Sequence, residues 1–169
     1  MIQRIQSVFL VIAVLINLAT FFVPMWQFSS GAGTELITGL SVESAEILSE
    51  GSRSVSFSGH ENSTKQLAHT SFLILAIISS LVLIFDIFQY NNRSRQITFA
   101  YVGIVLILLE ILSFVLLTQQ EPTFITGATP NSVAHFGFAF PVVAVVMAWM
   151  AINRIKKDDA LVKSVDRLR

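Results

Sequence analysis

Four long apolar runs, separated by polar segments, dominate the chain. The clearest run spans residues 97–118 (ITFAYVGIVLILLEILSFVLLT) and carries a single charge, Glu110. At about 1.5 Å per residue, a helix of this length reaches about 33 Å, which is roughly the hydrocarbon thickness of a bilayer. The other runs predict helices over residues 7–26, 67–90 and 135–155. The pattern predicts an all-α membrane protein: one domain, residues 1–169, built as a bundle of four transmembrane helices.

Two polar segments, 27–66 and 119–134, form the loops on one side of the predicted bundle. The longer segment is rich in Ser and Gly, and in places its apolar and polar residues alternate, which is typical of strands with one buried face. We therefore expect a small β-rich cap on the helix ends, with a helical turn over residues 45–50 as an alternative for that stretch. The expected strands cover residues 35–42, 53–58 and, in the second loop, 123–126.

The amino-acid composition supports a membrane location and limits the kinds of functional site that the chain can form. The chain is 53% hydrophobic and only 13% charged, whereas an ordinary soluble domain carries about 25% charged residues. Its formal net charge of zero argues against nucleic acid as a partner. Because it contains no Cys, disulfides, thiol nucleophiles and thiolate metal sites are excluded.

Basic residues gather on one side of the predicted bundle. Nine of the eleven Lys and Arg residues lie away from the two loops, and only Arg53 and Lys65 lie within the longer one. Cytoplasmic flanks of membrane helices carry an excess of Lys and Arg, so we expect both termini in the cytoplasm and the loops outside. The nine are Arg4, Arg93, Arg95, Arg154, Lys156, Lys157, Lys163, Arg167 and Arg169.

The two ends of the chain resemble a known family. The opening MIQRIQ and the closing RIKKDDALVKSVDRLR are similar to the termini of small four-helix inner-membrane proteins from the Bacteroidota, the domain-of-unknown-function 4293 family. This resemblance covers the whole chain and implies the bacterial inner membrane as the location, but it implies no activity and no site residue.

A second likeness is to claudin-type four-helix proteins, which have a Trp after the first helix and a Gly-Leu-Trp motif in a β-rich outer loop. Trp26 fits the first feature, and Gly39 with Leu40 fits the second in part. The loop Trp is replaced by Ser41, and the Cys pair of those proteins is missing. The likeness implies a four-helix bundle capped by a small sheet and nothing about barrier function.

Glu110 is the foremost candidate for a functional group inside the membrane. An ionised acid in a bilayer is unfavourable by about 2.5 kcal/mol or more, so its side chain should face protein. It could relay protons or bind a cation, it could pair with a partner subunit, or hydrogen bonds could simply hold it inside the bundle. Asn17, near the middle of the first predicted helix, could supply such a bond. We favour the structural or partner-pairing roles, because buried polar networks are often only structural.

Asp86 is a second candidate, near the end of the second predicted helix and close in sequence to Arg93 and Arg95. A helix C-terminus disfavours an acid, so we expect Asp86 to pair with one of these arginines. Its depth in the membrane differs from that of Glu110, and a catalytic pair of the two is not expected.

No catalytic residue, metal site or cofactor is predicted. The sequence has no Gly-rich phosphate loop, no Ser-His-Asp arrangement and no HExxH motif. His69, His135 and Glu121 are expected at the outer membrane surface, and two His and an acid could hold zinc. Their spacing matches no metal motif, however, so no metal site is expected. His135 and Glu121 are instead the best candidates for the site of a lipid-acting enzyme.

Residues 156–169 form the predicted cytoplasmic tail. Leu161, Val165 and Leu168 recur at i, i+4 and i+7, which predicts an apolar face on a helix. This helix could contact anionic lipid, dock on a cytoplasmic partner or simply be solvated, and its interspersed acids argue against pure lipid binding. The residues expected to make these contacts are Lys156, Lys157, Leu161, Lys163, Val165, Arg167, Leu168 and Arg169.

Three functions follow from these expectations. The leading one is a non-enzymatic accessory or scaffold subunit of a larger membrane complex, which contacts membrane lipids and a protein partner or a second copy of itself. The alternative is an oligomeric channel or an ion or proton pathway that uses Glu110. The third is a membrane enzyme that acts on lipid through His135 and Glu121.

Overall fold

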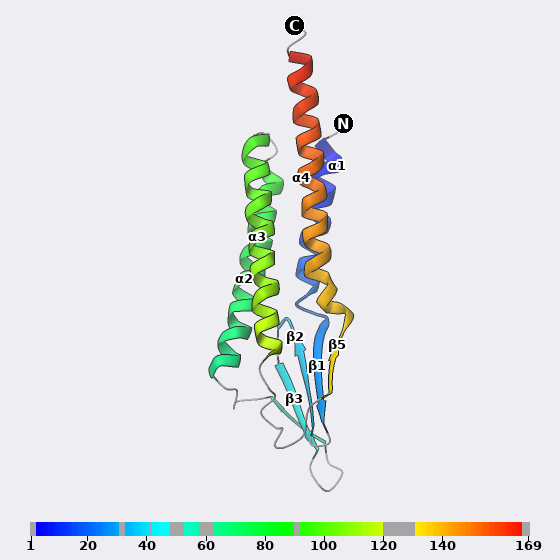
Figure 1. Cartoon of the computed structure of the whole chain (residues 1–169), viewed down its shortest axis with the longest axis vertical. Coiled ribbons are helices and arrows are strands. Elements are labelled where there is room, and N and C mark those ends of the chain that lie inside the picture. Colours follow the sequence, from blue (N-terminus) through cyan, green and yellow to red (C-terminus); the bar gives the residue numbers. More distant parts are fainter. Residues whose placement is uncertain are drawn as a thin grey trace.

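The computed structural model describes residues 3–30, 33–40, 42–47, 53–57, 63–89, 92–119 and 131–166. In this part of the chain, four helices form an elongated bundle with a five-stranded antiparallel sheet at one end (Figure 1). The helices are α1 (Gln3–Ala19), α2 (Ser63–Phe88), α3 (Arg93–Thr118) and α4 (Ala139–Asp166), and a short 3-10 helix, η1 (Phe136–Phe138), precedes α4. The strands are β1 (Pro24–Ser30), β2 (Gly33–Thr38), β3 (Val42–Ile47), β4 (Arg53–Phe57) and β5 (Asn131–Ala134), in the order β4-β3-β2-β1-β5.

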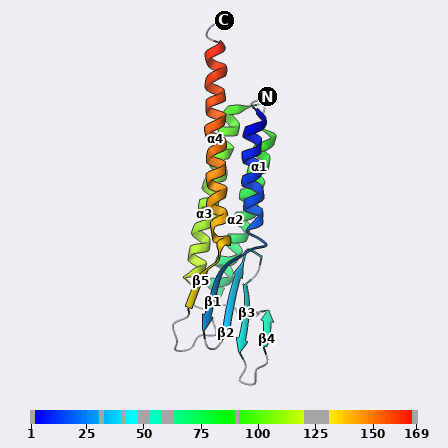
Figure 2. The ribbon, with the colours of Figure 1, turned by 90° about the vertical axis from the view of Figure 1, so that its right-hand side faces the viewer.

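The bundle has two different ends. The strands lie at one end, and both ends of the chain lie at the other, as two views at right angles show (Figures 1 and 2). We call these the sheet end and the terminal end. The end of α2 and the start of α3 also lie at the terminal end, so all four helices run along the same axis in alternating directions.

The helices have the length and composition of membrane spans. Within the described residues, Leu67–Phe88, Arg93–Thr118 and Phe136–Ser164 are long and apolar enough to cross a membrane, and Ser7–Ala19 is a shorter apolar helix. The predicted fold class, a four-helix membrane bundle with a small β-rich cap, is therefore confirmed. The chain is a multi-pass membrane protein.

The first helix ends earlier than predicted. α1 ends at Ala19 rather than at residue 26, and in the following turn three successive N–H groups bond to carbonyls three residues before them, as at many tightened helix ends. The Thr20 hydroxyl also donates to the Asn17 carbonyl at 2.6 Å. Pro24, which has no N–H to continue a helix, begins β1. The apolar run nevertheless continues, because side chains of β1 are buried at the sheet end.

The other helix bounds differ in the opposite sense. α2 and α3 each begin four residues before the predicted position, because the polar segments 63–66 and 93–96 extend the helices beyond their apolar runs. The predicted fourth helix, 135–155, and much of the predicted tail, 156–169, form the single helix α4.

The predicted strands agree with the structure only in part. The strand over residues 53–58 is confirmed as β4, whereas a single strand over 35–42 is wrong, because it divides at Gly39 into β2 and β3. A Cβ atom at Gly39 would lie 2.5 Å from the Thr20 carbonyl oxygen, so only glycine fits where β2 ends against the end of α1.

The alternative of a helical turn over residues 45–50 is wrong where β3 covers residues 45–47, and residues 48–50 lie outside the described residues. The strand predicted over 123–126 also lies outside them. The second loop contributes β5 instead, which pairs with β1.

Aromatic and aliphatic side chains join the sheet to the helix ends. Phe72 and Phe114, from α2 and α3, have ring centroids 5.7 Å apart, and Phe114 lies 5.6 Å from Phe138. A Cβ atom at Gly137 would lie 2.5 Å from the Pro24 carbonyl oxygen, so η1 packs directly on the start of β1. This buried cluster contains Met25, Phe28, Ile37, Phe72, Phe114 and Leu117.

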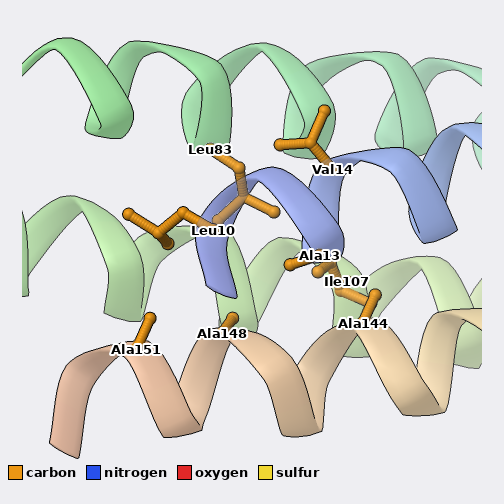
Figure 3. Close-up of a cluster of buried hydrophobic side chains, with 8 residues drawn as sticks. All are labelled: Leu10, Ala13, Val14, Leu83, Ile107, Ala144, Ala148 and Ala151. Atoms are coloured by element: carbon orange, nitrogen blue, oxygen red, sulfur yellow. The ribbon is translucent and has the colours of Figure 1, made fainter. Parts of the chain in front are cut away.

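A second buried cluster fills the bundle, and small residues let its helices approach closely. Ala144, Ala148 and Ala151 form a stripe on α4 that faces α1 (Figure 3), an arrangement that supports close packing in membranes. The cluster consists of Leu10, Ala13, Val14, Leu83, Ile107, Ala144, Ala148 and Ala151.

Candidate functional site

Buried polar residues occur at several levels of this otherwise apolar bundle. The buried positions of α3 recur at intervals of mostly three or four residues, which places them on one inward face. Asp86, Ser79 and Ser80 lie on the buried face of α2. The polar residues buried among the described helices and at the end of α1 are Asn17, Thr20, Ser79, Ser80, Asp86, Gln96, Glu110 and Ser113.

Glu110 is connected to α1 through α2. The Ser79 hydroxyl donates to Glu110 Oε2 at 3.2 Å. The Asn17 amide nitrogen, Nδ2, donates to Ser79 Oγ at 2.9 Å and to Ser80 Oγ at 3.1 Å. We call these four residues the Glu110 cluster. Asn17 and Glu110, which the sequence suggested as partners, are thus connected by a chain of bonds through Ser79, which ties three helices together.

The Glu110 cluster is only partly satisfied. The Ser79 hydroxyl has a single proton to donate, and it also lies 3.1 Å from the Ala76 carbonyl oxygen. Glu110 Oε1 and Asn17 Oδ1 are buried and have no hydrogen-bond partner among the described residues. Because the exposed fraction of Glu110 is 0%, its carboxyl does not reach the outer surface of the bundle, and this geometry does not favour pairing with another subunit.

Asp86 is the second buried carboxyl, and its predicted pairing is wrong. Its exposed fraction is 0%, and neither carboxyl oxygen has a hydrogen-bond partner among the described residues. Arg93 instead donates from Nη1 to the Asp158 carbonyl oxygen at 3.2 Å, and Arg95 is exposed. The helical period explains the difference: Asp86 follows the inward-facing Leu83 by three residues, so it points into the bundle and away from the arginines.

The two carboxyls lie at different depths. Ser79, which bonds to Glu110, precedes Asp86 by seven residues on α2, which corresponds to about 10 Å along the helix axis. This separation is too large for direct proton transfer between the two groups. Each carboxyl must therefore be considered with its own surroundings.

At the sheet end, His135 has a structural environment. Its Nε2 lies 3.0 Å from Gln27 Oε1, and its backbone N–H donates to the Met25 carbonyl oxygen at 3.0 Å. These contacts hold the end of β5 against β1. Glu121 lies outside the described residues, and among those that are described no group of three or more His, Cys, Asp or Glu side chains is placed to hold a metal ion.

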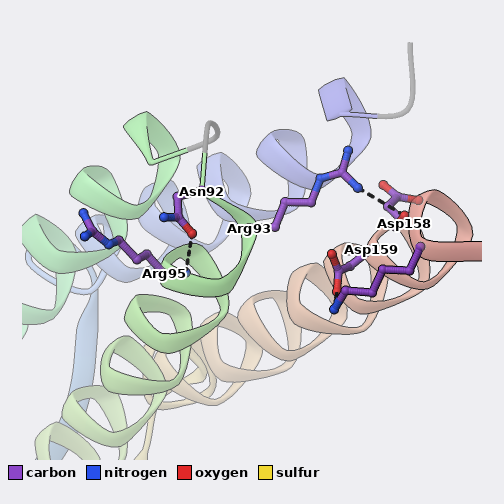
Figure 4. A network of polar contacts seen from close by, with 6 residues as sticks. Asn92, Arg93, Arg95, Asp158 and Asp159 are labelled. Atoms are coloured by element: carbon purple, nitrogen blue, oxygen red, sulfur yellow. Dashed lines mark hydrogen bonds and ion pairs between the residues drawn. The ribbon is translucent and has the colours of Figure 1, made fainter. Parts of the chain in front are cut away.

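At the terminal end, α4 continues beyond the other helices (Figure 1), and we call residues 156–166 the α4 projection. Contacts with α3 hold its base. Lys156 Nζ donates to the Tyr101 hydroxyl at 2.6 Å and lies 5.0 Å from the centroid of that ring. Arg93, about two turns of α3 closer to the end of the bundle than Tyr101, donates to the Asp158 carbonyl (Figure 4).

The residues predicted to contact a partner therefore differ in their availability. Lys156 is bound to Tyr101, and Lys163 forms a 2.6 Å ion pair with Asp159. Lys157 and Leu161 are exposed, and so is Val162, which lies beside the predicted apolar stripe. Of the remaining predicted contacts, the side chain of Val165 and the whole of Arg167, Leu168 and Arg169 lie outside the described residues.

The sequence did not single out every polar residue that the structure buries. Ser79 and Ser80 were missed, because a serine in an apolar helix is a weak signal by itself; the inward spacing from Ser79 to Leu83 and Asp86 could have found the first. Glu35, which the sequence placed at the start of an expected strand without a role of its own, is 1% exposed on β2. It pairs in register with the buried Phe28 of β1, so it lies on the inner face of the sheet.

Comparison with known proteins gives a family without a described activity. The family described as "Domain of unknown function (DUF4293)" matches residues 2–168. No curated protein matches the chain. The family match extends over the bundle, the sheet and the α4 projection, so all three belong to the region that the family model covers.

Proposed function

The chain belongs to the DUF4293 family, and because its description names no activity, we propose from the geometry that this protein is a non-enzymatic accessory or scaffold subunit of a larger membrane complex. Its proposed location is the bacterial inner membrane, with both termini in the cytoplasm. One observation supports the proposal above others: α4 runs without a break from the membrane span into a projection that presents exposed apolar side chains.

The α4 projection is suited to hold a partner at a fixed distance from the membrane. From Lys156 to Asp166 it extends by about 15 Å. Its base is held by the contacts of Lys156 with Tyr101 and of Arg93 with Asp158. A partner bound to it would therefore keep a defined position relative to the bundle, which is the property that a scaffold needs.

The surface of the projection favours a protein partner over a lipid surface. The exposed fractions of Leu161 and Val162 are 59% and 43%, and amphipathic helices of this kind commonly dock into apolar grooves. In this proposal the membrane-embedded part of α4 ends where its charged residues begin, at Arg154, so Leu161 and Val162 lie on the part of the helix that continues away from the bilayer. Asp159, which pairs with Lys163, also reduces the attraction of the projection for anionic lipid.

The proposal is tested by replacing the apolar surface without removing the helix. The double variant Leu161→Ser, Val162→Ser, expressed in the host as a tagged full chain and purified in mild detergent, should lose a stoichiometric partner that copurifies with the wild type. Ala160→Ser is the matched control, because it changes the neighbouring exposed position without removing a large apolar side chain. The control should retain the partner.

Two results would contradict the proposal. One is that the wild-type chain purifies without any stoichiometric partner, and the other is that the double variant retains the partner as well as Ala160→Ser does. A homo-oligomer present equally in all three samples would direct attention to the second candidate function below.

The proposed orientation has its own test, because the chain contains no Cys. Ser132, on β5, and Ser164, on the projection, are both exposed. A single Cys introduced at Ser132 should react with a membrane-impermeant maleimide in spheroplasts, and one at Ser164 should react only after the membrane is opened. The reverse pattern would show that the termini are outside.

A second candidate function is an ion or proton pathway in an oligomer. It is favoured by two fully buried carboxyls, Glu110 and Asp86, at two depths of the bundle, since intramembrane acids often mark such pathways. In reconstituted vesicles, Glu110→Gln and Asp86→Asn should each reduce proton or cation flux well below that of the wild type. Unaltered flux in both variants would remove this candidate.

A further inference from the structure

A shallow groove lies between the end of α2 and the start of α3. Arg95 forms part of it, and Figure 4 shows Arg95 pointing away from α4, whereas Arg93 reaches toward it. The two arginines therefore serve different surfaces, although they are only two residues apart. The residues that line the groove are Phe85, Gln89, Ser94, Arg95, Thr98 and Phe99.

The groove carries one positive charge and no acidic side chain in its lining. Within the described residues, the Arg95 guanidinium makes no hydrogen bond or ion pair; only its backbone N–H is bonded, to Asn92 Oδ1 at 3.3 Å. The side chains of Arg93, which faces α4, and of Lys163, on α4, are both engaged. Arg93 bonds to the Asp158 carbonyl, and Lys163 pairs with Asp159. No described residue therefore uses any of the five guanidinium donors of Arg95, and their planar arrangement matches phosphate.

The other half of the groove is apolar. Phe85 is 51% exposed, and it packs edge to face against Phe99, with 5.1 Å between the ring centroids and 76° between the ring planes. Phe85 lies within the span Leu67–Phe88, and Arg95 lies in the first turn of the span Arg93–Thr118. The groove therefore crosses the boundary between the hydrocarbon core and the headgroup layer, with its aromatic part on the hydrocarbon side.

We propose that this groove binds an anionic phospholipid from the leaflet at the terminal end. The phosphate contacts Arg95, the uncharged polar groups of Ser94 and Gln89 face the rest of the headgroup, and the acyl chains run along Phe85 and Phe99. A free phosphate would not use the aromatic half, and an acidic protein segment would have to enter the hydrocarbon layer to reach it. The groove presents a positive charge at its headgroup side and aromatic surface at its hydrocarbon side, which is the order of groups in an anionic phospholipid. This site is independent of the partner proposed for α4.

The test measures lipid binding to the purified full chain. Delipidated protein in mild detergent is titrated with phosphatidylglycerol or phosphatidylcholine, and bound lipid is counted by native mass spectrometry. The wild type should prefer phosphatidylglycerol, and Arg95→Gln should weaken that binding about fivefold while leaving phosphatidylcholine unchanged. Arg154→Gln is the matched control, because Arg154 is an exposed arginine of α4 outside the groove, and it should retain the preference.

Three outcomes would overturn the proposal. The first is that the wild type binds both lipids equally. The second is that Arg154→Gln loses as much affinity for phosphatidylglycerol as Arg95→Gln does, which would indicate a general effect of basic flanks. The third is that soluble glycerol phosphate binds as tightly as the lipid. Arg95→Gln should unfold at the wild-type temperature, because this exposed side chain makes no hydrogen bond or ion pair with the described residues. Arg95→Lys, which keeps the charge but not the planar donors, should fall between the wild type and Arg95→Gln.

Discussion

Glu110 and Asp86 offer a comparison of two buried carboxyls in one bundle. Both have an exposed fraction of 0%, and both lie on inward faces of membrane helices. Glu110 accepts a hydrogen bond from Ser79, which in turn accepts one from Asn17. Asp86, about 10 Å further along α2, has no partner for either oxygen among the described residues.

The difference shows that burial does not by itself define the contribution of an acid to stability. Removing Glu110 would leave the Ala76 carbonyl as the remaining acceptor of the Ser79 hydroxyl and would break the hydrogen-bond chain that ties α1 and α2 to α3, and the loss of a buried hydrogen bond is unfavourable. Removing the Asp86 carboxyl would leave no unpaired hydrogen-bond partner among the described residues. An unpartnered buried acid is destabilising, so the presence of Asp86 favours a use other than stability, which is the basis of the second candidate function.

The largest effect is expected for Glu110→Met, which removes the acceptor but keeps an unbranched side chain. The free energy of unfolding should fall by about 2 kcal/mol, because Ser79 and Asn17 lose the end of their hydrogen-bond chain. Reversible unfolding in mixed micelles with increasing SDS measures this change. Glu110→Gln keeps an acceptor oxygen and should stay within about 1 kcal/mol of the wild type; an equally stable Glu110→Met would show that the cluster does not stabilise the bundle.

A change of opposite sign is expected for Asp86→Leu. Leucine has the same branching as aspartate but no polar atoms, so the variant should be more stable than the wild type by about 1 kcal/mol. The same SDS titration applies, and Asp86→Asn, which remains polar, should gain less. A loss of stability in Asp86→Leu would mean that the carboxyl has a partner beyond the described residues.

The sequence was sufficient to predict the spans, because twenty or so consecutive apolar residues leave few alternatives to a membrane helix. It was insufficient to place the end of α1. The run from Phe21 to Trp26 is as apolar as the helix before it, yet β1 buries Met25 in the sheet end. A run of apolar residues indicates that the segment is shielded from water but not whether it is a helix or a strand, and a strand that packs on helix ends is shielded as well.

The hydrogen-bond partners of buried polar residues were harder to predict than the positions of these residues along their helices. The sequence placed Asn17 near the middle of its helix and Glu110 past the midpoint of its own. The structure connects the two through Ser79, whose role depends on how two helices pack. Asp86 and Arg93 are close in sequence yet face different directions. Proximity along the chain does not determine which face a side chain occupies, and the helical period does.

A double-mutant cycle would sharpen the comparison further. Asn17→Leu combined with Glu110→Met should destabilise by about 0.5–1 kcal/mol less than the sum of the single changes, because both belong to one hydrogen-bond chain. Asn17→Leu combined with Asp86→Leu should be additive within about 0.5 kcal/mol, since no hydrogen bond among the described residues connects them. Coupling of equal size in the two cycles would contradict the separation of the two sites.

The smallest effect is expected for the ion pair between Lys163 and Asp159 on the α4 projection. The two atoms lie 2.6 Å apart, closer than any bond of the Glu110 cluster, but the Lys163 side chain is 70% exposed. Water and salt screen such pairs, so Lys163→Gln should change the free energy of unfolding by less than about 0.5 kcal/mol. If it destabilised as much as Glu110→Met, contact distance rather than exclusion from water would govern these polar groups, and the contrast between Glu110 and Asp86 would need another explanation.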